Sequence, residues 1–469
     1  MNRQKLLGEE KISKLLIQFS VPAIIGMMVN TLYNIVDRMY IGNIPEVGGL
    51  ALTGVGITMP IMTIILAFGM LVGIGTSARI SLKLGEHKRD EAEQHLGNAF
   101  TLILLISILI TVLGLTFMKP LLQIFGASQD TEIYASQYMQ IIFSGTIFNM
   151  LSFGLNHSIR SDGNPKIAMF SMLIGAGTNI LLDPLFIFAL GLGVRGAAIA
   201  TVISQIASTI WILYYFTKGK GSIKISRHNV KLKKAVIISI FSIGMSPFAM
   251  QIAQSLVQVL ANNALKEYGG DLAIGAMTII SSISMIFMMP LFGLNQGSQP
   301  IIGYNYGAKK YHRVKDAVKI PVIVATLIVS VGWLLIQFAP ELLIRAFSSD
   351  ESLLAMAKIG LRTFLFMLPV LGFQTISSNY FQSIGQAKVS MFLSLLRQVI
   401  LLIPCLIVLP RVGGLGLMGV WLAGPVADGL ASIITGVVFF GSLRKLKEYK
   451  VNDCDKEMTS LHQESPLKV

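Results

Sequence analysis

The chain has 469 residues, of which 53% are hydrophobic and only 13% are charged. A soluble globular domain carries about 25% charged residues, so this composition excludes an ordinary water-soluble enzyme. Many uninterrupted apolar runs approach the ~20 residues that a helix needs to cross a bilayer. Runs such as residues 99–118 do not alternate between apolar and polar positions, which excludes a transmembrane β-barrel. The composition therefore predicts an all-α polytopic membrane protein.

Apolar runs between charged or Gly/Pro-rich segments divide the chain into twelve expected membrane helices. Every second connection is rich in Lys and Arg, whereas the alternate connections are short and poor in both. The positive-inside rule then predicts that both termini are cytoplasmic, and it explains the net charge of +14 without nucleic acid. The expected spans are residues 15–41, 50–80, 96–118, 133–155, 167–190, 194–216, 235–262, 272–303, 318–340, 353–380, 389–409 and 415–443.

Glycine-rich segments recur at a constant spacing, which indicates an internal repeat. The segment GTSARISLKLGEHKR from Gly75 matches GSQPIIGYNYGAKKY from Gly297, an offset of 222 residues. Further along, GNPKIAMFS from Gly163 matches GQAKVSMF from Gly385 at the same offset. After one inserted residue, GLGVRG at 191–196 matches GLGLMG at 414–419 at an offset of 223. Six spans is an even number, so both halves enter the membrane in the same orientation, which predicts two six-helix bundles related by a parallel pseudo-two-fold repeat. The expected units are a cytoplasmic N-terminus (1–14), an N-lobe (15–216), a basic cytoplasmic linker (217–234), a C-lobe (235–443) and a cytoplasmic tail (444–469).

Carboxylates inside the expected spans indicate a functional site, because a charged side chain at the bilayer centre costs about 2.5–3.5 kcal/mol. Two stand out in this sequence. Asp37 follows Asn34 on one face of the first span, and Asp183 follows Asn179 by one turn in the fifth. Pro184 comes next and frees a backbone carbonyl near the acid. These oxygen-rich groups predict a cation site.

Each acid also has a purely structural explanation. Asp37 lies near the outer end of its span beside Arg38, so the two could form an interfacial ion pair, and Asp183 could serve a helix kink or cap. In the repeat register Asp183 corresponds to Cys405, and Asp37 corresponds to residues 259–262. The C-lobe is therefore expected to lack an equivalent of this acid pair.

Other classes of membrane protein are disfavoured by what the spans contain. The six histidines do not have the spacing of metal ligands, and we find no catalytic set of nucleophile and base. An ion channel would be expected to show a pore-lining ring of polar residues, which the spans do not contain. We therefore expect a transporter with no catalytic residues, no metal site and no organic cofactor.

Three segments resemble the multidrug and toxic compound extrusion (MATE) family, in its MepA-like bacterial branch. They are NIVDRMYIG at 34–42, NILLDPLFI at 179–187 and GAAIAT at 196–201, and the similarity continues through GQAK at 385–388. The resemblance implies a V-shaped pair of six-helix bundles that exports bulky, often cationic drugs in exchange for H⁺ or Na⁺. Matched motif by motif, it implies a cation-coupling site formed by Asp37, Asn179, Asp183 and Thr201, with Asn34 beside it.

One branch of that family places an essential carboxylate on the seventh and tenth spans of the C-lobe. This chain has Gln254, Ser255, Phe373 and Gln374 in those regions, a departure that weakens any expectation of an ion site in the C-lobe.

The physical chemistry of the two acids favours a proton switch. Two carboxylates that approach each other in a medium of low dielectric constant cannot both ionise cheaply, so the pair can load and release a proton. Protonation would let the first span repack against the fifth and sixth, and by linkage it would change the affinity for drug. The hard oxygen ligands would also suit Na⁺, but we favour H⁺ as the coupling ion.

Drug contacts are less apparent from the sequence. A pocket for varied amphiphilic cations combines adaptable Met side chains with aromatic faces, although Met and Phe in membrane helices more often face lipid or a neighbouring helix. A lipid-linked oligosaccharide or lipid flippase of related fold is the alternative function; its anionic substrate would require basic cavity residues, and Arg79 and Arg397 are expected at helix ends. The candidate drug contacts are Met285, Phe287, Met288, Met289, Gln254, Ser255 and Gln374.

The expected partners follow from this interpretation. They are small-molecule drugs and dyes together with the lipid bilayer, and nucleic acid is not among them. We expect a monomer in the cell (plasma) membrane.

Overall fold

Residues 3–219, 221–347 and 350–463 are described by the computed structural model, without the side chains of residues 3–5, 271 and 447–463. This part of the chain is almost entirely helical and contains no strand. Within it, eleven helical segments are long and apolar enough to cross a membrane, and a bent pair forms a twelfth. The helices are α1 (Arg3–Glu9), α2 (Ile12–Gly42), α3 (Gly48–Ile57), α4 (Met59–Gly85), α5 (Arg89–Thr116), α6 (Met118–Ile124), α7 (Gln129–Ser161), α8 (Pro165–Pro184), η1 (Leu185–Ala189), α9 (Val194–Thr217), α10 (Lys234–Gly307), α11 (Tyr311–Phe338), α12 (Pro340–Ile344), α13 (Glu351–Phe364), α14 (Leu368–Ser383), α15 (Ala387–Leu395), η2 (Leu396–Leu402), α16 (Ile403–Val408), η3 (Leu409–Gly414) and α17 (Gly416–Gln463).

Two of the expected spans are divided into separate helices by a break or a bend. The span predicted at 50–80 is interrupted at Thr58, where α3 ends and α4 begins. Pro60 lies in the first turn of α4, where a residue without an N–H group is tolerated. The span predicted at 353–380 is divided into α13 and α14, which meet at an angle of 48° just before Pro369. In both cases proline marks the start of the second helix.

The seventh and eighth spans are joined without a long loop. Helix α10 contains both Lys234–Gly270 and Leu272–Gly307, which are separated at Gly270. Gly270 has φ 65° and ψ −163°, a backbone conformation that is open essentially to glycine alone. The chain reverses there, so the two predicted spans remain distinct.

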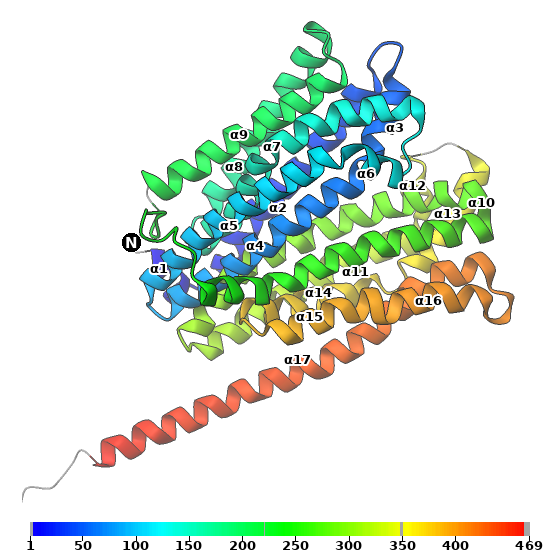
Figure 1. Cartoon of the computed structure of the whole chain (residues 1–469). Helices are drawn as coiled ribbons and strands as arrows, with labels where there is room; N and C mark the ends of the chain where they lie inside the picture. The colour runs from blue at the N-terminus through cyan, green and yellow to red at the C-terminus, as the bar shows by residue number, and fades with distance from the viewer. Residues whose placement is uncertain (1–2, 220, 348–349, 464–469) are drawn as a thin grey trace, which may run out of the picture.

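The spans form two groups, as Figure 1 shows. Helices α2–α9 lie on one side of the molecule and α10–α16 on the other, and the end of α17 extends past the bundle. A Cβ atom added at Gly85 would lie 2.1 Å from the carbonyl oxygen of Tyr304, and one at Gly307 would lie 2.2 Å from that of Leu82. Since 85 + 222 = 307 and 82 + 222 = 304, the same contact is made twice, as a parallel two-fold repeat requires.

Other close approaches between the groups also depend on glycine. A Cβ atom at Gly75 would lie 2.3 Å from the carbonyl oxygen of Ile240, and one at Gly297 would lie 2.4 Å from Ser20 Oγ. Gly75 is in the second part of α4 and Ser20 in the first part of α2, whereas Ile240 and Gly297 are near the two ends of α10, so all four lie towards the basic connections. The two lobes are therefore packed backbone to backbone at that end of the molecule.

Candidate cation site and drug-contact residues

Three helices of the N-lobe bring the predicted cation-coupling residues together. Asp37 is on the buried face of α2, Asn179 and Asp183 are in the last two turns of α8, and Thr201 is in the second turn of α9. Asn179 and Asp183 are completely buried, and only 8% of Asp37 and 7% of Thr201 are exposed. Asp37 is therefore not an exposed interfacial residue, in contrast to the alternative that its position beside Arg38 suggested.

The backbone becomes irregular next to Asp183. Helix α8 ends at Pro184, and the chain continues as the π-helical turn η1, closed by a hydrogen bond from Leu190 N to the carbonyl oxygen of Leu185 (2.9 Å). Proline has no N–H group, so the carbonyl of residue 180 loses its helical donor. Such π-helical turns inside membrane helices often accompany functional sites.

One amide organises the hydrogen bonds of the site. Asn179 Nδ2 donates to Asp183 Oδ1 (3.1 Å) and to Thr201 Oγ1 (3.5 Å), so it links α8 with α9. The side chains of Asp37 and Asp183 are within hydrogen-bonding reach of each other. Two neighbouring carboxylates in a buried site repel each other when both are ionised, so this arrangement favours a proton or a cation between them.

The site has more acceptors than donors. Asp37 Oδ1, Asp183 Oδ2 and Asn179 Oδ1 are buried and accept no hydrogen bond from the described residues. Neither acid has a salt bridge in this part of the chain, and the adjacent Arg38 is exposed and donates to Met59 Sδ (3.3 Å). An unpaired buried acceptor costs about 1–3 kcal/mol, so these oxygens favour a proton or a hard cation.

Two tyrosines adjoin the acids, and sequence analysis did not identify them. Tyr33 lies near Asp37 and Asp183, and the hydroxyl of Tyr138, on α7, is within hydrogen-bonding reach of Thr201. Tyr33 precedes Asp37 by four residues, a helical spacing that could have revealed it. Tyr138 carries no such signal, because only the packing of α7 against α9 brings it to the site.

Asn34 is placed differently from the other predicted cation-coupling residues. It is exposed, and its Nδ2 donates back along α2 to the carbonyl oxygen (2.7 Å) and Oδ1 (3.1 Å) of Asn30. The structure therefore does not bring Asn34 into the buried group.

The Met and Phe residues predicted to contact drugs lie in different environments and do not share one site. Met289 Sδ accepts a hydrogen bond from Thr31 Oγ1 of α2 (3.5 Å), so it lies between the lobes. Phe287 packs on α11, where a Cβ atom added at Gly332 would lie 2.5 Å from its ring. Met288 packs against the hydrophobic core, whereas Met285 is half exposed. Met289 thus faces the partner lobe, and Phe287 has a packing role.

The polar residues predicted to contact drugs are also dispersed. Gln254 is exposed, and Ser255 Oγ donates to the carbonyl oxygen of Gln251 (3.3 Å). Gln374 is buried in α14, and its Oε1 has no partner among the described residues. The available contacts do not place these three in one pocket, and a role in drug binding stays a prediction.

The C-lobe contains a buried charge that sequence analysis overlooked. Asp428, on α17, is 4% exposed, and its Oδ1 accepts a hydrogen bond from Arg397 Nε at 2.5 Å. The expectation that Arg397 lies at a helix end is wrong, since it is in η2 within the span Ala387–Gly414. A single acid within the last span was the available signal for Asp428.

This ion pair lies on the helices that correspond to α8 and α9. In the repeat register Asn179 corresponds to residue 401 (179 + 222) and Thr201 corresponds to residue 424 (201 + 223). Arg397 is one turn before the first of these positions, and Asp428 is one turn after the second. The C-lobe therefore holds its own charged residues on the equivalent pair of helices, but they neutralise each other.

Comparisons with known proteins agree with this architecture. A family model described as MatE matches residues 22–185 and 247–407, one segment in each lobe and more than half of the chain. The chain belongs to the MatE family. Among its relatives, the "Multidrug export protein MepA" of Staphylococcus haemolyticus (strain JCSC1435) is 30% identical over 409 residues, which cover 87% of this chain and 89% of the relative. The predicted membership of the MATE family, of MepA-like type, is thus confirmed.

Solved structures of MATE transporters have the same fold. The "MATE multidrug transporter DinF-BH", solved in complex with a dye, is 39% identical, with a TM-score of 0.85 over 92% of this chain and 96% of that one. A "multidrug resistance MATE family transporter of the MOP superfamily" in an outward-facing conformation is 25% identical, with a TM-score of 0.89 over 95% of this chain and 99% of that one. The predicted fold class is confirmed. Within the described residues, no group of three or more His, Cys, Asp or Glu side chains is placed to bind a metal ion.

Proposed function

We propose that this chain is a secondary active multidrug exporter that exchanges amphiphilic, often cationic drugs for a coupling cation by alternating access. The names of its relatives support drug export, and the acid pair of the N-lobe supports cation coupling. The observation that carries the proposal is the excess of acceptors around Asp37 and Asp183. A buried group of this kind is expected to change its protonation or its ion occupancy when the surrounding helices move.

We favour H⁺ as the coupling ion. The proximity of Asp37 and Asp183 favours a proton on one of them, because two ionised carboxylates would repel each other, and Asn179 stabilises the charge that remains by donating to Asp183. A sodium ion could instead use the same carboxylate, amide and hydroxyl oxygens, since these are hard ligands. The two ions are therefore alternatives at one site.

Coupling follows from the position of the pair between helices. Asp37 belongs to α2, which also contacts the C-lobe, whereas Asp183 and Thr201 belong to α8 and α9. Loss of the shared proton would create mutual repulsion and separate α2 from α8. A drug that binds one arrangement more tightly than the other would then be linked to the ion, with reciprocal effects on affinity.

The orientation in the plasma membrane is part of the proposal. The Lys- and Arg-rich connections support a cytoplasmic location for both termini. Cys454 is the natural reporter, although its side chain lies outside the described residues. In a Cys405→Ser background, a membrane-impermeant thiol reagent should label Cys454 only after intact cells are permeabilised. Prompt labelling of intact cells would contradict this orientation.

The decisive experiment is dye transport in proteoliposomes with one gradient imposed at a time. A proton gradient at equal sodium concentrations should drive uptake of a fluorescent cationic dye, and a sodium gradient at equal pH should not. Vesicles with Asp37→Asn protein provide the matched control and should resemble protein-free vesicles. Uptake driven by sodium alone would identify Na⁺ as the coupling ion, and no response to either gradient would contradict antiport.

A further inference from the structure

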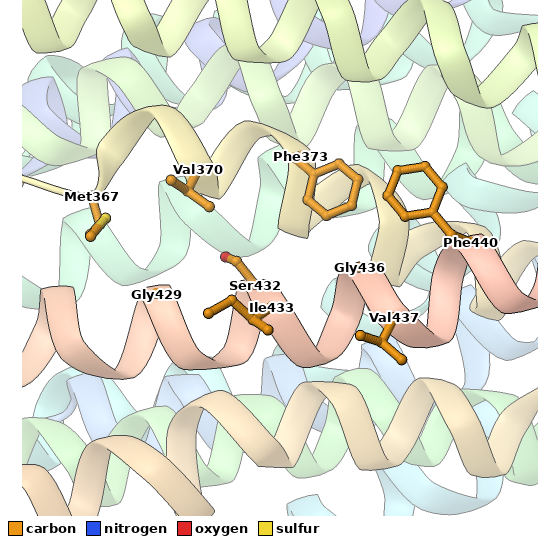
Figure 2. A pocket seen from close by; sticks show the side chains of 9 residues that line it. All are labelled: Met367, Val370, Phe373, Gly429, Ser432, Ile433, Gly436, Val437 and Phe440. Atoms are coloured by element: carbon orange, nitrogen blue, oxygen red, sulfur yellow. The ribbon is translucent and has the colours of Figure 1, made fainter.

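A groove of about 550 Å³ lies on the C-lobe between α14 and α17. Figure 2 shows that apolar side chains from both helices border it, with the rings of Phe373 and Phe440 facing each other at one end. These rings are stacked, with centroids 6.0 Å apart. The apolar side chains that line it are Met367, Val370, Phe373, Ile433, Val437 and Phe440.

The groove exists because two side chains are missing from α17. Gly429 and Gly436 line it, and in the repeat register they correspond to Ile206 (429 − 223) and Leu213 (436 − 223) of α9. Leu213 packs against the hydrophobic core of the N-lobe. Glycine at both C-lobe positions leaves this space open.

One hydrogen bond that joins the equivalent helices of the N-lobe has no counterpart beside the groove. Thr209 Oγ1 of α9 donates to the carbonyl oxygen of Phe148 on α7 (3.0 Å). The corresponding C-lobe residues are Ser432 (432 − 223 = 209) and Val370 (370 − 222 = 148). Ser432 Oγ has no hydrogen-bond partner among the described residues. Helices α14 and α17 are joined elsewhere, by the hydrogen bond between the hydroxyls of Tyr380 and Ser442 (3.2 Å), but not at this position.

The groove opens towards the bilayer. Ile433, Val437 and Phe440 on its rim are 66%, 71% and 57% exposed, and they belong to the membrane span Gly416–Leu446. Figure 1 shows α17 on the side of the C-lobe away from α2–α9, so exposed apolar side chains there are turned to the hydrocarbon and not to the space between the lobes. Ser432 is the one polar residue in the lining, and no lining residue carries a charge that would attract a cationic drug or hold water.

The length and direction of the groove indicate what kind of molecule can bind in it. From Gly429 to Phe440 the groove follows about three turns of α17, roughly 16 Å at 1.5 Å per residue. It is parallel to the helix and spans about half of the ~30 Å hydrocarbon core. We propose that it binds one acyl chain of a membrane lipid, which occupies the space that the side chains of Ile206 and Leu213 fill at the corresponding positions of the N-lobe.

The site can be filled without disturbing the backbone. A Cβ atom at Gly429 would lie 3.7 Å from Met367 Cε, and one at Gly436 would lie 3.6 Å from Phe373 Cε1, which are ordinary contacts. Gly429→Ile combined with Gly436→Leu gives the C-lobe the residues of the N-lobe. Gly441→Leu is the matched control, because Gly441 is on the same helix, exposed and without neighbours within 4 Å.

The test uses protein in nanodiscs that contain phosphatidylcholine with a photoreactive group on its acyl chain. Peptides that carry Met367 and Ile433 should be labelled in the wild type and in Gly441→Leu. In the filled variant we expect labelling of Met367 inside the groove to fall about tenfold, as loss of roughly two buried methylene contacts predicts. Labelling of Ile433, which is exposed on the rim, should persist in every variant and is the internal reference. Unchanged labelling of Met367 in the filled variant would overturn the proposal.

A single variant and a measurement of Tm control for possible misfolding of the double variant. The single variant Gly436→Leu should also lose labelling of Met367, and added long-chain lipid should raise the Tm of the wild type in detergent more than that of either filled variant. Equal gains in Tm would count against a bound chain. Protection of the groove by a cationic dye, but not by unlabelled lipid, would show that the occupant is a drug and would also overturn the proposal.

Discussion

Both lobes carry buried charge within their membrane spans but balance it in opposite ways: the N-lobe acids lie on α2 and α8, whereas the C-lobe pair lies on the equivalents of α8 and α9. In the N-lobe, Asp37 and Asp183 contact each other and have no salt bridge within the described residues. In the C-lobe, Asp428 is held by Arg397 at 2.5 Å. A carboxylate with a guanidinium partner keeps its charge, whereas two facing carboxylates require a proton or a cation. The two halves of the repeat therefore share their backbone packing, and the difference in charge balance is the basis for our proposal that ion coupling belongs to the N-lobe.

The largest effect is expected when the acid pair is removed. Asp37→Asn and Asp183→Asn should each reach the membrane at near-normal levels but concentrate dye no better than protein-free vesicles, because the remaining group cannot form the same proton-sharing pair. Dye accumulation in vesicles and membrane protein levels measure the two effects. Transport at wild-type rates in both variants would contradict the assignment of ion coupling to the acid pair of the N-lobe.

Breaking the ion pair of the C-lobe should affect stability and not coupling. Asp428→Asn leaves the Arg397 guanidinium without its carboxylate, so we expect a loss of about 3–5 kcal/mol in the free energy of unfolding. Thermal unfolding in detergent measures this loss, and Arg397→Met combined with Asp428→Leu should recover much of it. A shifted pH profile of transport in stably folded Asp428→Asn would show that the C-lobe participates in coupling.

A smaller effect is expected at the hydroxyl beside the acid pair. Thr201→Val removes the acceptor of Asn179 Nδ2 and should cost about 1 kcal/mol, with a modest change in the pH dependence of transport. Thr209→Val is the control on the same helix, since it loses the bond to Phe148 but is remote from the acids. If both variants change the pH profile equally, Thr201 has no special role in the site.

The smallest effect is expected at the register partner of Asp183. Cys405 is partly buried in α16, and Cys405→Ser keeps its size while the new hydroxyl can bond the carbonyl four residues earlier. Transport and its pH profile should be nearly unchanged.

The three polar residues predicted to contact drugs give a related prediction. Measurements of dye transport against pH should show altered drug preference, but the same pH profile, for Gln254→Ala, Ser255→Ala and Gln374→Ala. A flattened pH profile in any of these three variants or in Cys405→Ser would contradict the assignment of coupling to the N-lobe.

Much of the architecture was predictable from the sequence because its signals are local. Apolar runs must be about as long as the bilayer is thick, and the spacing of glycines such as Gly85 and Gly307 revealed the repeat. The N-lobe acids were also predictable, since an unneutralised carboxylate inside a span is costly whatever surrounds it. Asp428 was missed although its signal was equally local. The breaks at Thr58 and between α13 and α14 could be located only from the course of the backbone in the structure.

Tertiary structure alone decided which side chains meet. Tyr138 joins the acid pair only because α7 packs on α9, and Arg397 neutralises Asp428 only because η2 lies against α17. The groove between α14 and α17 likewise depends on which faces of two distant helices are opposed. Hydrophobic length and the cost of buried charge are properties of single segments, whereas charge balance and packing gaps are properties of pairs of segments. Properties of single segments can be read directly from the sequence, whereas properties of pairs of segments are established only when the helices pack.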